Sequence, residues 1–342
     1  MALVTRKVVS RDEDGMRLDR WFRTHYPQVT FAYLNKLART GQLRVDSRRA
    51  KPNTRLEEGQ ELRIPPLAFE ARPADRPALE TAPLTKEERK IFDEMVMHDD
   101  RDIFVLNKPA GLAVQGGTKT HRHVDGLLIG LGMELGERPR LVHRLDRETS
   151  GVLVVAKRRT VAAALGKLFA SRAVRKIYWA AVKGVPKPPQ GRIDVPLLKA
   201  QSLEGDRVRA AEPGEESAQR AVTHYSIIDK APPVLAWLSL KPSTGRQHQL
   251  RAHMAHIGHP IVGDDKYGGD EDLPDTVANK LHLHARRIVF PHPRGGTVDI
   301  TAPLPPHMRE TWSLFGFDPD KYDDGEAKDC GQPFVAGEVR SL

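Results

Sequence analysis

Hydrophobic residues recur every three or four positions in two stretches near the start of the chain, which predicts two short helices over residues 16–26 and 30–40. Gly41 follows the second stretch and is expected to end it. Alternating hydrophobic residues at 43–45 and 62–64, with turn residues between them, predict two short strands. The positions expected to face the core of this module are Leu18, Trp21, Phe22, Phe31, Leu34 and Leu37.

The longer remainder of the chain predicts more strands than helices. Its hydrophobic runs are short and bounded by turn residues, as is typical of an antiparallel sheet. Strands are predicted at 152–156, 177–182, 222–228, 234–240 and 286–290, and helices near 124–131, 160–171 and 247–257. Polar residues at 99–102 and the pair Gly295 and Gly296 predict two hairpins. We therefore expect an α+β fold with a mainly antiparallel mixed sheet and flanking helices.

Composition divides the chain into four segments. Residues 65–85 carry five prolines and few hydrophobic residues in phase, so we expect an extended linker there. The last 36 residues hold 8 Asp or Glu and 4 Lys or Arg without a strong period, which predicts a peripheral acidic tail. The expected boundaries are 1–66 for the small module, 67–90 for the linker, 91–306 for the main domain and 307–342 for the tail.

The charge of the chain indicates a polyanionic partner. It has 54 Lys or Arg against 45 Asp or Glu and a pI of about 9.6, and nucleic acid is the simplest partner for such a protein. The single cysteine, Cys330, excludes an internal disulfide and a cysteine-based zinc site. We see neither a secretory leader nor an apolar run of about 20 residues, and we expect a cytoplasmic protein that does not enter a membrane.

One carboxylate stands out at the start of a predicted strand. In HRLDRETSGVLVVAK, residues 143–157, Asp146 lies between Arg144 and Arg147 directly before a hydrophobic run. Such an aspartate commonly caps a turn or pairs with an arginine. Nearby positive charge also keeps a carboxylate ionised, as a catalytic role near neutral pH requires. The spacing alone leaves both interpretations open.

Three segments together resemble the pseudouridine synthases of the RluA superfamily. They are LNKPAGLAVQ (106–115), HRLDRETSG (143–151) and TGRQHQLRAHMAHIGHPIVGDDKYGG (244–269). The resemblance covers residues 10–306 and implies an enzyme that isomerises uridine to pseudouridine in RNA without a cofactor. The basic module at residues 16–66 resembles the S4 RNA-binding module, which precedes the catalytic domain in the ribosomal members.

The resemblance implies roles for individual residues. Asp146 matches the catalytic aspartate, Tyr178 the active-site tyrosine, and Arg251 the arginine that pairs with the aspartate. Arg144 matches the arginine that displaces the base, with a phosphate contact or a structural ion pair as its alternatives. Further RNA contacts are expected from His143, Arg147, Arg246, His248 and Lys108, an apolar floor under the uracil from Leu281 and Leu283, and contacts of the S4-like module from Arg20, Arg23, Lys36, Arg39, Arg44 and Arg48.

The isomerisation of uridine that the resemblance implies requires one ionised carboxylate. It can attack C1′, remove the 2′ proton on a glycal route, or stabilise positive charge on the sugar, and the sequence does not discriminate among these. The uridine must first leave its stack, at a cost of a few kcal/mol.

The substrate also follows from the resemblance. VPLLKAQSLEGDRVR, residues 195–209, resembles the RluC type more than the RluD type, which tends to carry a Pro-Ile-Gly-Arg stretch there. This implies a monomeric enzyme for large-subunit (23S) ribosomal RNA, free or in an assembly intermediate. The alternatives are an RluD-type synthase with other target sites, a non-catalytic S4-type RNA-binding or ribosome-assembly factor, and an RNA glycosidase that releases uracil.

A run of histidines requires that a metal site be considered. Zinc-binding histidine pairs on a helix are usually four residues apart. His248 and His253 are five apart, whereas His253 and His256 are three apart, with His259 beyond them. We therefore expect no metal, and we assign these histidines to RNA contacts or to hydrogen bonds in the core.

Overall fold

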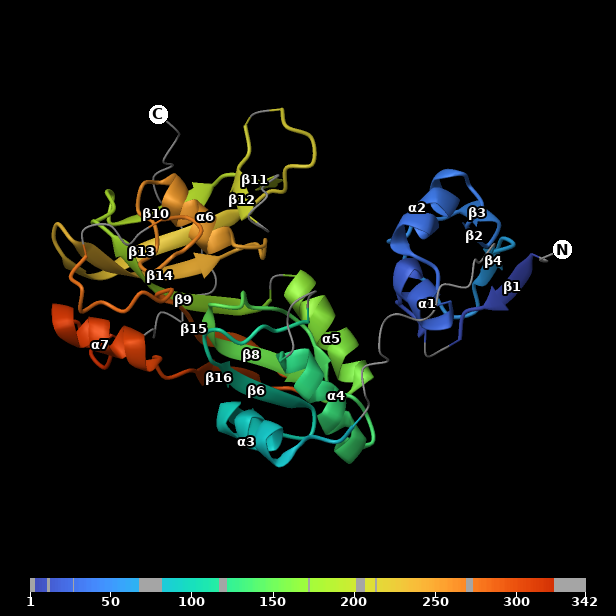
Figure 1. Cartoon of the computed structure of the whole chain (residues 1–342), viewed down its shortest axis with the longest axis horizontal. Helices are drawn as coiled ribbons and strands as arrows, with labels where there is room; N and C mark the ends of the chain where they lie inside the picture. Colours follow the sequence, from blue (N-terminus) through green and yellow to red (C-terminus); the bar gives the residue numbers. More distant parts are fainter. Residues whose placement is uncertain are drawn as a thin grey trace. The chain divides into compact units, whose positions relative to one another are not determined.

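The structure of the protein is a computed structural model. In it the chain forms two units, Met1–Glu80 and Thr81–Leu342 (Figure 1). The residues that it describes are 4–10, 13–26, 28–67, 82–116, 122–171, 173–200, 207–212, 214–268 and 273–322. Among these, no helix combines the length and the apolar character needed to cross a membrane.

The N-terminal unit packs two helices on a small sheet. The helices are α1 (Leu18–His25) and α2 (Phe31–Arg39), and the strand order is β1 (Thr5–Val8), β4 (Glu61–Ile64), β2 (Arg44–Val45), β3 (Arg48–Arg49). Five of the six expected core residues are buried, but Phe31 is 62% exposed. Side chains lean toward the start of their helix, so this first residue of α2 extends beyond the core. The expectation for Phe31 is therefore wrong.

One mixed sheet forms the frame of the large unit. Its strand order is β10 (Gln190–Asp194), β13 (Val222–Ala231), β14 (Leu235–Pro242), β9 (Arg175–Lys183), β15 (Leu283–Pro291), β8 (Ser150–Ala156), β6 (Ile103–Lys108) and β5 (Val96–Asp99). In addition, β16 (Thr297–Thr301) pairs with β15, and β7 (Arg140–Leu141) pairs with β8. These pairs are antiparallel except β8 with β15, which is parallel. The expected α+β fold is confirmed.

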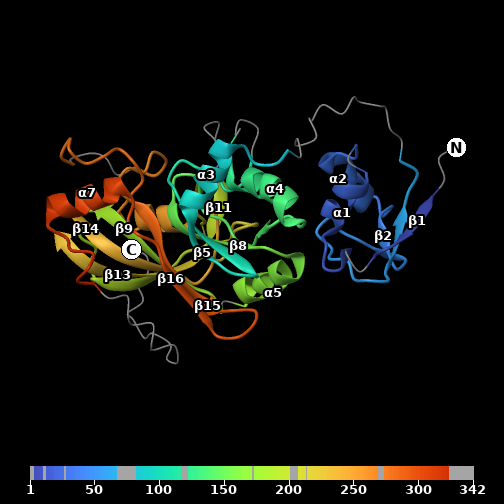
Figure 2. The same cartoon turned by 90° about the horizontal axis from the view of Figure 1, so that it is seen from below.

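Helices cover both faces of this sheet. On one face lie α3 (Lys86–Met95), α4 (Val124–Leu135) and α6 (Gln249–His256), and on the other α5 (Arg159–Ala170) and α7 (Pro306–Phe315). Figure 1 shows α6 and α7 on opposite sides of β14 and β9, and Figure 2 shows α4 and α5 on opposite sides of β8. Because neighbouring side chains of a strand point to opposite faces, the central strands are hydrophobic throughout.

A row of paired residues crosses the middle of the sheet. Lys108 of β6 pairs with Gly151 of β8, Gly151 with Ala285 of β15, and Ala285 with Tyr178 of β9. Directly paired residues share a face, so these four lie on the face covered by α3, α4 and α6. Gly151 has φ +108°, and a Cβ there would lie 2.3 Å from the carbonyl oxygen of Ala285. The two smallest residues of the row thus allow β8 and β15 to approach closely.

Two of the expected boundaries differ from the structure. Helix α3 lies partly in the expected linker and begins with a capping box between Thr85 and Glu88. Helix α7 lies in the expected tail, where its Trp312 is buried against Trp237 of β14. Two further parts of the expected linker and tail, residues 68–81 and 323–342, lie outside the described residues.

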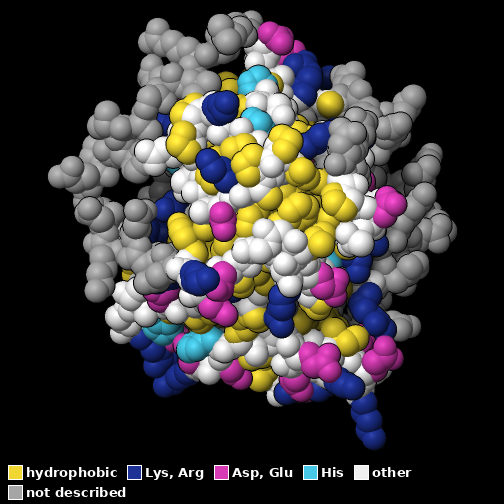
Figure 3. Space-filling view, turned by 90° about the vertical axis from the view of Figure 1, so that its left-hand side faces the viewer, with side chains coloured by type: hydrophobic (Ala, Val, Ile, Leu, Met, Phe, Trp, Pro, Cys, Tyr) yellow, Lys and Arg dark blue, Asp and Glu magenta, His cyan; other side chains and the backbone are white. Residues whose placement is uncertain are grey.

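Not all of helix α7 is covered. Leu314 remains 50% exposed, whereas Met308 and Trp312 are buried. Figure 3 faces the left-hand side of Figure 1 and shows hydrophobic side chains gathered at the middle of that face, with charged ones around them.

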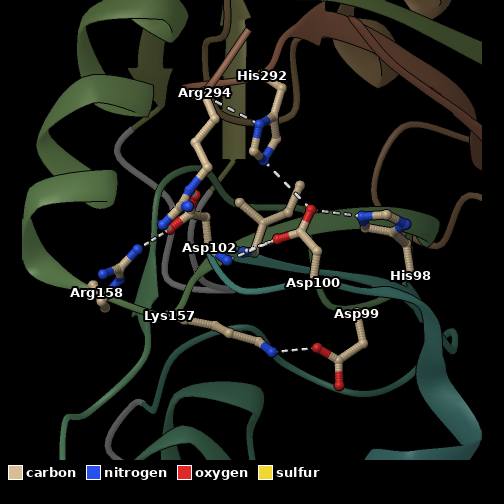
Figure 4. Close-up of polar contacts among 9 residues, drawn as sticks. His98, Asp99, Asp100, Asp102, Lys157, Arg158, His292 and Arg294 are labelled. Atoms are coloured by element: carbon tan, nitrogen blue, oxygen red, sulfur yellow. Dashed lines mark hydrogen bonds and ion pairs between the residues drawn. The ribbon is translucent and has the colours of Figure 1, made fainter. Parts of the chain in front are cut away.

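A network of ion pairs closes the end of the sheet at the β5–β6 hairpin (Figure 4). The side chain of Asp102 is 2% exposed and pairs with Arg158, before α5, and with Arg294, between β15 and β16. Asp100 contacts the Nε2 atoms of His98 at 2.8 Å and His292 at 3.4 Å. Segments distant in the sequence are therefore joined through two carboxylates.

We expect Asp102→Asn to lower the free energy of unfolding by roughly 2–4 kcal/mol, because both arginines lose a buried charged partner. The control is Asp93→Asn, which removes an exposed ion pair with Arg89 one helical turn away and is expected to cost less than about 1 kcal/mol. Urea denaturation of the two variants checks this, and equal losses would contradict it.

Candidate active site

The loop that carries Asp146 joins β7 to β8 and is anchored on both sides of this residue. Leu145 is buried in the hydrophobic core, and the N–H of Thr149 donates to the carbonyl oxygen of Asp146 at 3.2 Å, which closes a turn. The next residue, Ser150, contacts Nδ1 of the buried His284 at 2.9 Å through its hydroxyl. Asp146 itself is half-buried. Its position is therefore set by neighbours that belong to the core.

Lys108 holds this loop against the preceding turn of the chain. Its ammonium donates to the carbonyl oxygens of Pro109 and Leu112 at 2.8 Å and of Arg147 at 2.9 Å. Three acceptors match the three protons of an ammonium. Burial lowers the pKa of Lys108 to about 7, while the carboxylates of Glu148 and then Asp146 act in the opposite direction. Lys108 is 0% exposed, so the expectation of an RNA contact is wrong, and its function is to clamp the loop.

Asp146 lies at the centre of the charged and polar side chains of the site. Burial has the largest effect on the pKa of each surrounding group, and the charge of Asp146 raises each of these pKa values. The groups are Lys108, Tyr178, His248, Arg251 and Tyr267. The carboxylate accepts no hydrogen bond from any side chain or backbone group that the structure describes. It is therefore an acceptor available to a substrate.

Tyr178 lies on β9, in the row that also contains Gly151. Burial, and then the charge of Asp146, raise its pKa well above the usual value, so the hydroxyl stays protonated. The ring packs against the core cluster that contains Leu281 and Leu283. These leucines are 4% and 3% exposed and offer almost no surface to a base. The expected floor under the uracil is thus part of the core that supports Tyr178.

Arg251 on α6 pairs with a different carboxylate from the expected one. Its Nε lies 2.8 Å from Oδ2 of Asp264 and its Nη2 2.5 Å from Oδ1, a bidentate pair that is almost fully buried. Nη2 also contacts Asp265 at 3.0 Å. Burial tends to lower the pKa of Arg251, but the hydrogen bond and charge of Asp264, followed by the charge of Asp146, raise it. Asp146 acts on this arginine at longer range, without a direct ion pair in this structure.

His248 and Tyr267 complete this side of the site. His248 is 7% exposed and stands directly before α6, and its Nδ1 lies 3.1 Å from the hydroxyl of Tyr267. The guanidinium of Arg251 lies 5.3 Å from the centre of the Tyr267 ring. Sequence reasoning missed Asp264 and Tyr267. The signal for both was their place in GDDKYGG, at the end of the third segment of the resemblance.

The other expected RNA contacts divide into exposed and buried groups. Arg144 is exposed and forms no hydrogen bond or ion pair with the described part of the chain. Arg147 and Arg246 are exposed, and each donates from Nε to a loop carbonyl, that of Gly111 at 3.0 Å and that of Arg220 at 3.1 Å. All three are open to a polyanion.

His143 contacts neighbouring parts of the protein. Its Nε2 accepts from the N–H of Val154 at 2.8 Å, and its ring stacks on Phe169 with centroids 4.7 Å apart. Burial, and then the positive charge of Lys176, lower the pKa of His143 to about 3, so the ring is neutral. His143 therefore packs between the loop and α5, and its contact with RNA stays a prediction.

The histidines considered for a metal have other partners. Both ring nitrogens of His253 form hydrogen bonds at 2.9 Å, with the hydroxyl of Thr223 and the carbonyl of Val195. Nδ1 of His259 contacts the carbonyl of Lys183 at 2.9 Å. Within the described ranges, no group of three or more His, Cys, Asp or Glu side chains is arranged to hold a metal ion.

Known proteins share this sequence and fold. The family model of RNA pseudouridylate synthases matches residues 102–256. The ribosomal large subunit pseudouridine synthase C of Pasteurella multocida strain Pm70 is 35% identical, over 88% of this chain and 91% of its own, and that of Escherichia coli strain K12 is 36% identical, over 86% and 92%. The chain belongs to the RNA pseudouridylate synthase family. Its activity is therefore that of an RNA pseudouridine synthase.

Solved structures agree with this family assignment. Human RNA pseudouridylate synthase domain containing 4 is 30% identical, with a TM-score of 0.56 over 66% of this chain and 95% of its own. Human RNA pseudouridylate synthase domain containing 1 is 27% identical, with a TM-score of 0.51 over 61% and 83%.

We expect Lys108→Met to lower the free energy of unfolding by roughly 3 kcal/mol, because it removes the donor to the carbonyl oxygens of Pro109, Leu112 and Arg147. Turnover should also fall, since the loop of Asp146 loses its clamp. The control, Lys167→Met, changes an exposed lysine of α5 and should leave both properties nearly unchanged. Urea denaturation and a pseudouridine assay test this, and a stable, active Lys108→Met protein would contradict the clamp.

Proposed function

We propose that this enzyme isomerises specific uridines of large-subunit ribosomal RNA, with Asp146 as its catalytic carboxylate. The observation that supports Asp146 most is its environment: a half-buried carboxylate without a hydrogen-bond partner in the described chain, held by a clamped loop among Arg251, Tyr178 and His248. A structural aspartate would be expected to have a partner. This arrangement favours the catalytic interpretation of the sequence over the capping interpretation.

The reaction rearranges one bond. The N1–C1′ bond breaks and its electron pair leaves with the uracil. A bond then forms between C5 and C1′, C5 loses its proton and N1 gains one, so the product is an isomer of the substrate. Asp146 attacks C1′ or removes the 2′ proton, and both routes require the ionised form. Tyr178, protonated and beside Asp146, is placed to contact the uracil ring and to assist proton movement at C5.

Arg144 acts when the uridine flips out of its stack, before the bonds rearrange. It lies two residues from Asp146, is exposed, and has no partner in the described chain. A planar guanidinium can stack on bases, so it can fill the gap that a flipped uridine leaves.

The N-terminal unit supplies general affinity for RNA. Arg20, Arg23, Lys36, Arg39 and Arg48 are exposed on its helices and hairpin, whereas Arg44 is half-buried and donates to the carbonyl of Ser47 at 3.0 Å. Two helices on a small sheet are consistent with an S4-like module. Such exposed charges bind phosphates with little sequence preference.

The choice of large-subunit ribosomal RNA rests on the relatives, because those named ribosomal large subunit pseudouridine synthase C align over most of this chain. The residues of the site come from one chain, so we propose that a monomer suffices. An enzyme of ribosomal RNA works where ribosomes assemble, and we place it in the cytoplasm.

We expect Asp146→Asn to reduce tritium release from large-subunit RNA labelled with [5-³H]uridine by about 10³-fold or more, because the variant keeps the shape but not the anion. Glu148→Gln is the control, since it neutralises an adjacent carboxylate of the same loop and should stay within about tenfold of wild type. Turnover by Asp146→Asn at the wild-type rate would remove Asp146 from the mechanism.

We expect the combined variant Arg20→Gln, Arg23→Gln, Lys36→Gln and Arg39→Gln to weaken RNA binding and to flatten its salt dependence. The log–log slope should fall by about 0.7–0.9 for each phosphate that the variant no longer neutralises. Filter binding between 50 and 300 mM salt measures both. Lys86→Gln with Lys167→Gln, two exposed lysines of the large unit, is the control. An unchanged slope in the fourfold variant would exclude this surface from RNA binding.

A further inference from the structure

Three groups form a hydrogen-bonded chain beside Asp146. The N–H of Val208, in strand β12 (Arg207–Ala210), donates to the hydroxyl oxygen of Tyr267 at 2.9 Å, and this oxygen lies 3.1 Å from His248 Nδ1. The two rings meet edge to face, with an interplanar angle of 90° and centroids 5.8 Å apart. The hydroxyl of Tyr267 thus joins the hairpin of β11 (Leu197–Ala200) and β12 to the residue before α6.

The first donor of this chain fixes the direction of its first hydrogen bond. A backbone N–H can only donate, so Val208 occupies one lone pair of the tyrosine oxygen, and the hydroxyl proton remains available to His248 Nδ1. A neutral imidazole that accepts at Nδ1 carries its proton on Nε2. Burial, the largest influence, lowers the pKa of His248 even though Asp146 acts to raise it, which is consistent with a neutral ring.

The Nε2 atom is free to bind something else. It has no partner among the residues that the structure describes, and it is not one of the fully buried nitrogens that lack a partner. It therefore reaches the surface of the site, near enough to Asp146 for their charges to interact. His248 also has φ +48°, a left-handed conformation that is unfavourable for a residue other than glycine and that is common at functional sites.

We propose that His248 donates a hydrogen bond from Nε2 to a carbonyl oxygen of the flipped uracil, and that Tyr267 is the positioning residue that fixes this tautomer. The proposal rests on the proposed function. When the N1–C1′ bond breaks, its electron pair moves onto the uracil, and the carbonyl oxygens share the charge. A neutral donor already aimed at one of these oxygens stabilises the charge without transferring its proton.

Two substitutions distinguish the functions of the two ring nitrogens of His248. His248→Asn retains an acceptor for Tyr267 near the position of Nδ1, lacks a group at the position of Nε2, and tolerates the left-handed conformation. His248→Gln extends an amide N–H toward the position of Nε2 but loses the contact with Tyr267. We expect kcat to fall about 10²-fold or more in His248→Asn and less than about tenfold in His248→Gln, with KM and RNA affinity nearly unchanged.

Tyr267→Phe tests the positioning role by a measurement other than activity. In ¹⁵N-histidine NMR spectra, assigned with His248→Asn, we expect the wild-type ring to carry its proton on Nε2 and the Tyr267→Phe ring to show a mixture of tautomers. The kcat of this variant should fall about fivefold, the value of one hydrogen bond.

The assay is tritium release from large-subunit, small-subunit and transfer RNA in parallel, with thermal unfolding as the check on folding. Release from another RNA would change the proposed substrate, and the variants would then be compared on the RNA that reacts. Wild-type kcat in His248→Asn, equal losses in His248→Asn and His248→Gln, or a wild-type proton on Nδ1 would each overturn the proposal.

Discussion

The close approach of β8 and β15 at Gly151 determines where the proposed catalytic residues of this protein lie. These strands form the parallel pair of an otherwise antiparallel sheet, and the space between Gly151 and the carbonyl of Ala285 has no room for a Cβ. The chain enters β8 from the loop of Asp146, so the register of that pair also fixes the height of the carboxylate above the sheet. Tyr178 lies beside Ala285 in the same row and thus reaches the same region.

A second constraint acts on the loop from the opposite side of Gly151. Lys108 occupies the next position of the row, and its three carbonyl acceptors join the turn after β6 to the loop of Asp146. Lys108 is fully buried and does not reach RNA, and its charged form lies close enough to Asp146 for the two charges to interact. One buried lysine therefore combines a mechanical function with an electrostatic one.

The sequence predicted the order of the large elements well, because their hydrophobic periods are strong. The resemblance also predicted that Asp146, Tyr178 and Arg251 lie in one region, and the structure places them close enough for Asp146 to affect the pKa values of the other two. The sequence could not show that Arg251 pairs with Asp264, because the pairing depends on how the chain turns after α6. It misassigned Lys108 for a related reason: a polar side chain in a motif suggests a ligand contact, and only three-dimensional packing reveals that carbonyl groups satisfy it.

The pairing of Arg251 with Asp264 has a consequence for Asp146. A bidentate arginine pair with Asp146 would occupy both of its oxygens and oppose attack on a substrate, whereas Arg251 directs its Nε and Nη2 to Asp264 in a buried pair. The positive charge of Arg251 stays close enough to Asp146 for the two charges to interact. The oxygens of Asp146, meanwhile, stay available for the ribose of the target nucleotide. Because Asp264 accepts the hydrogen bonds of Arg251, the positive charge of this arginine remains near Asp146. The arginine does not compete with a substrate for the oxygens of Asp146.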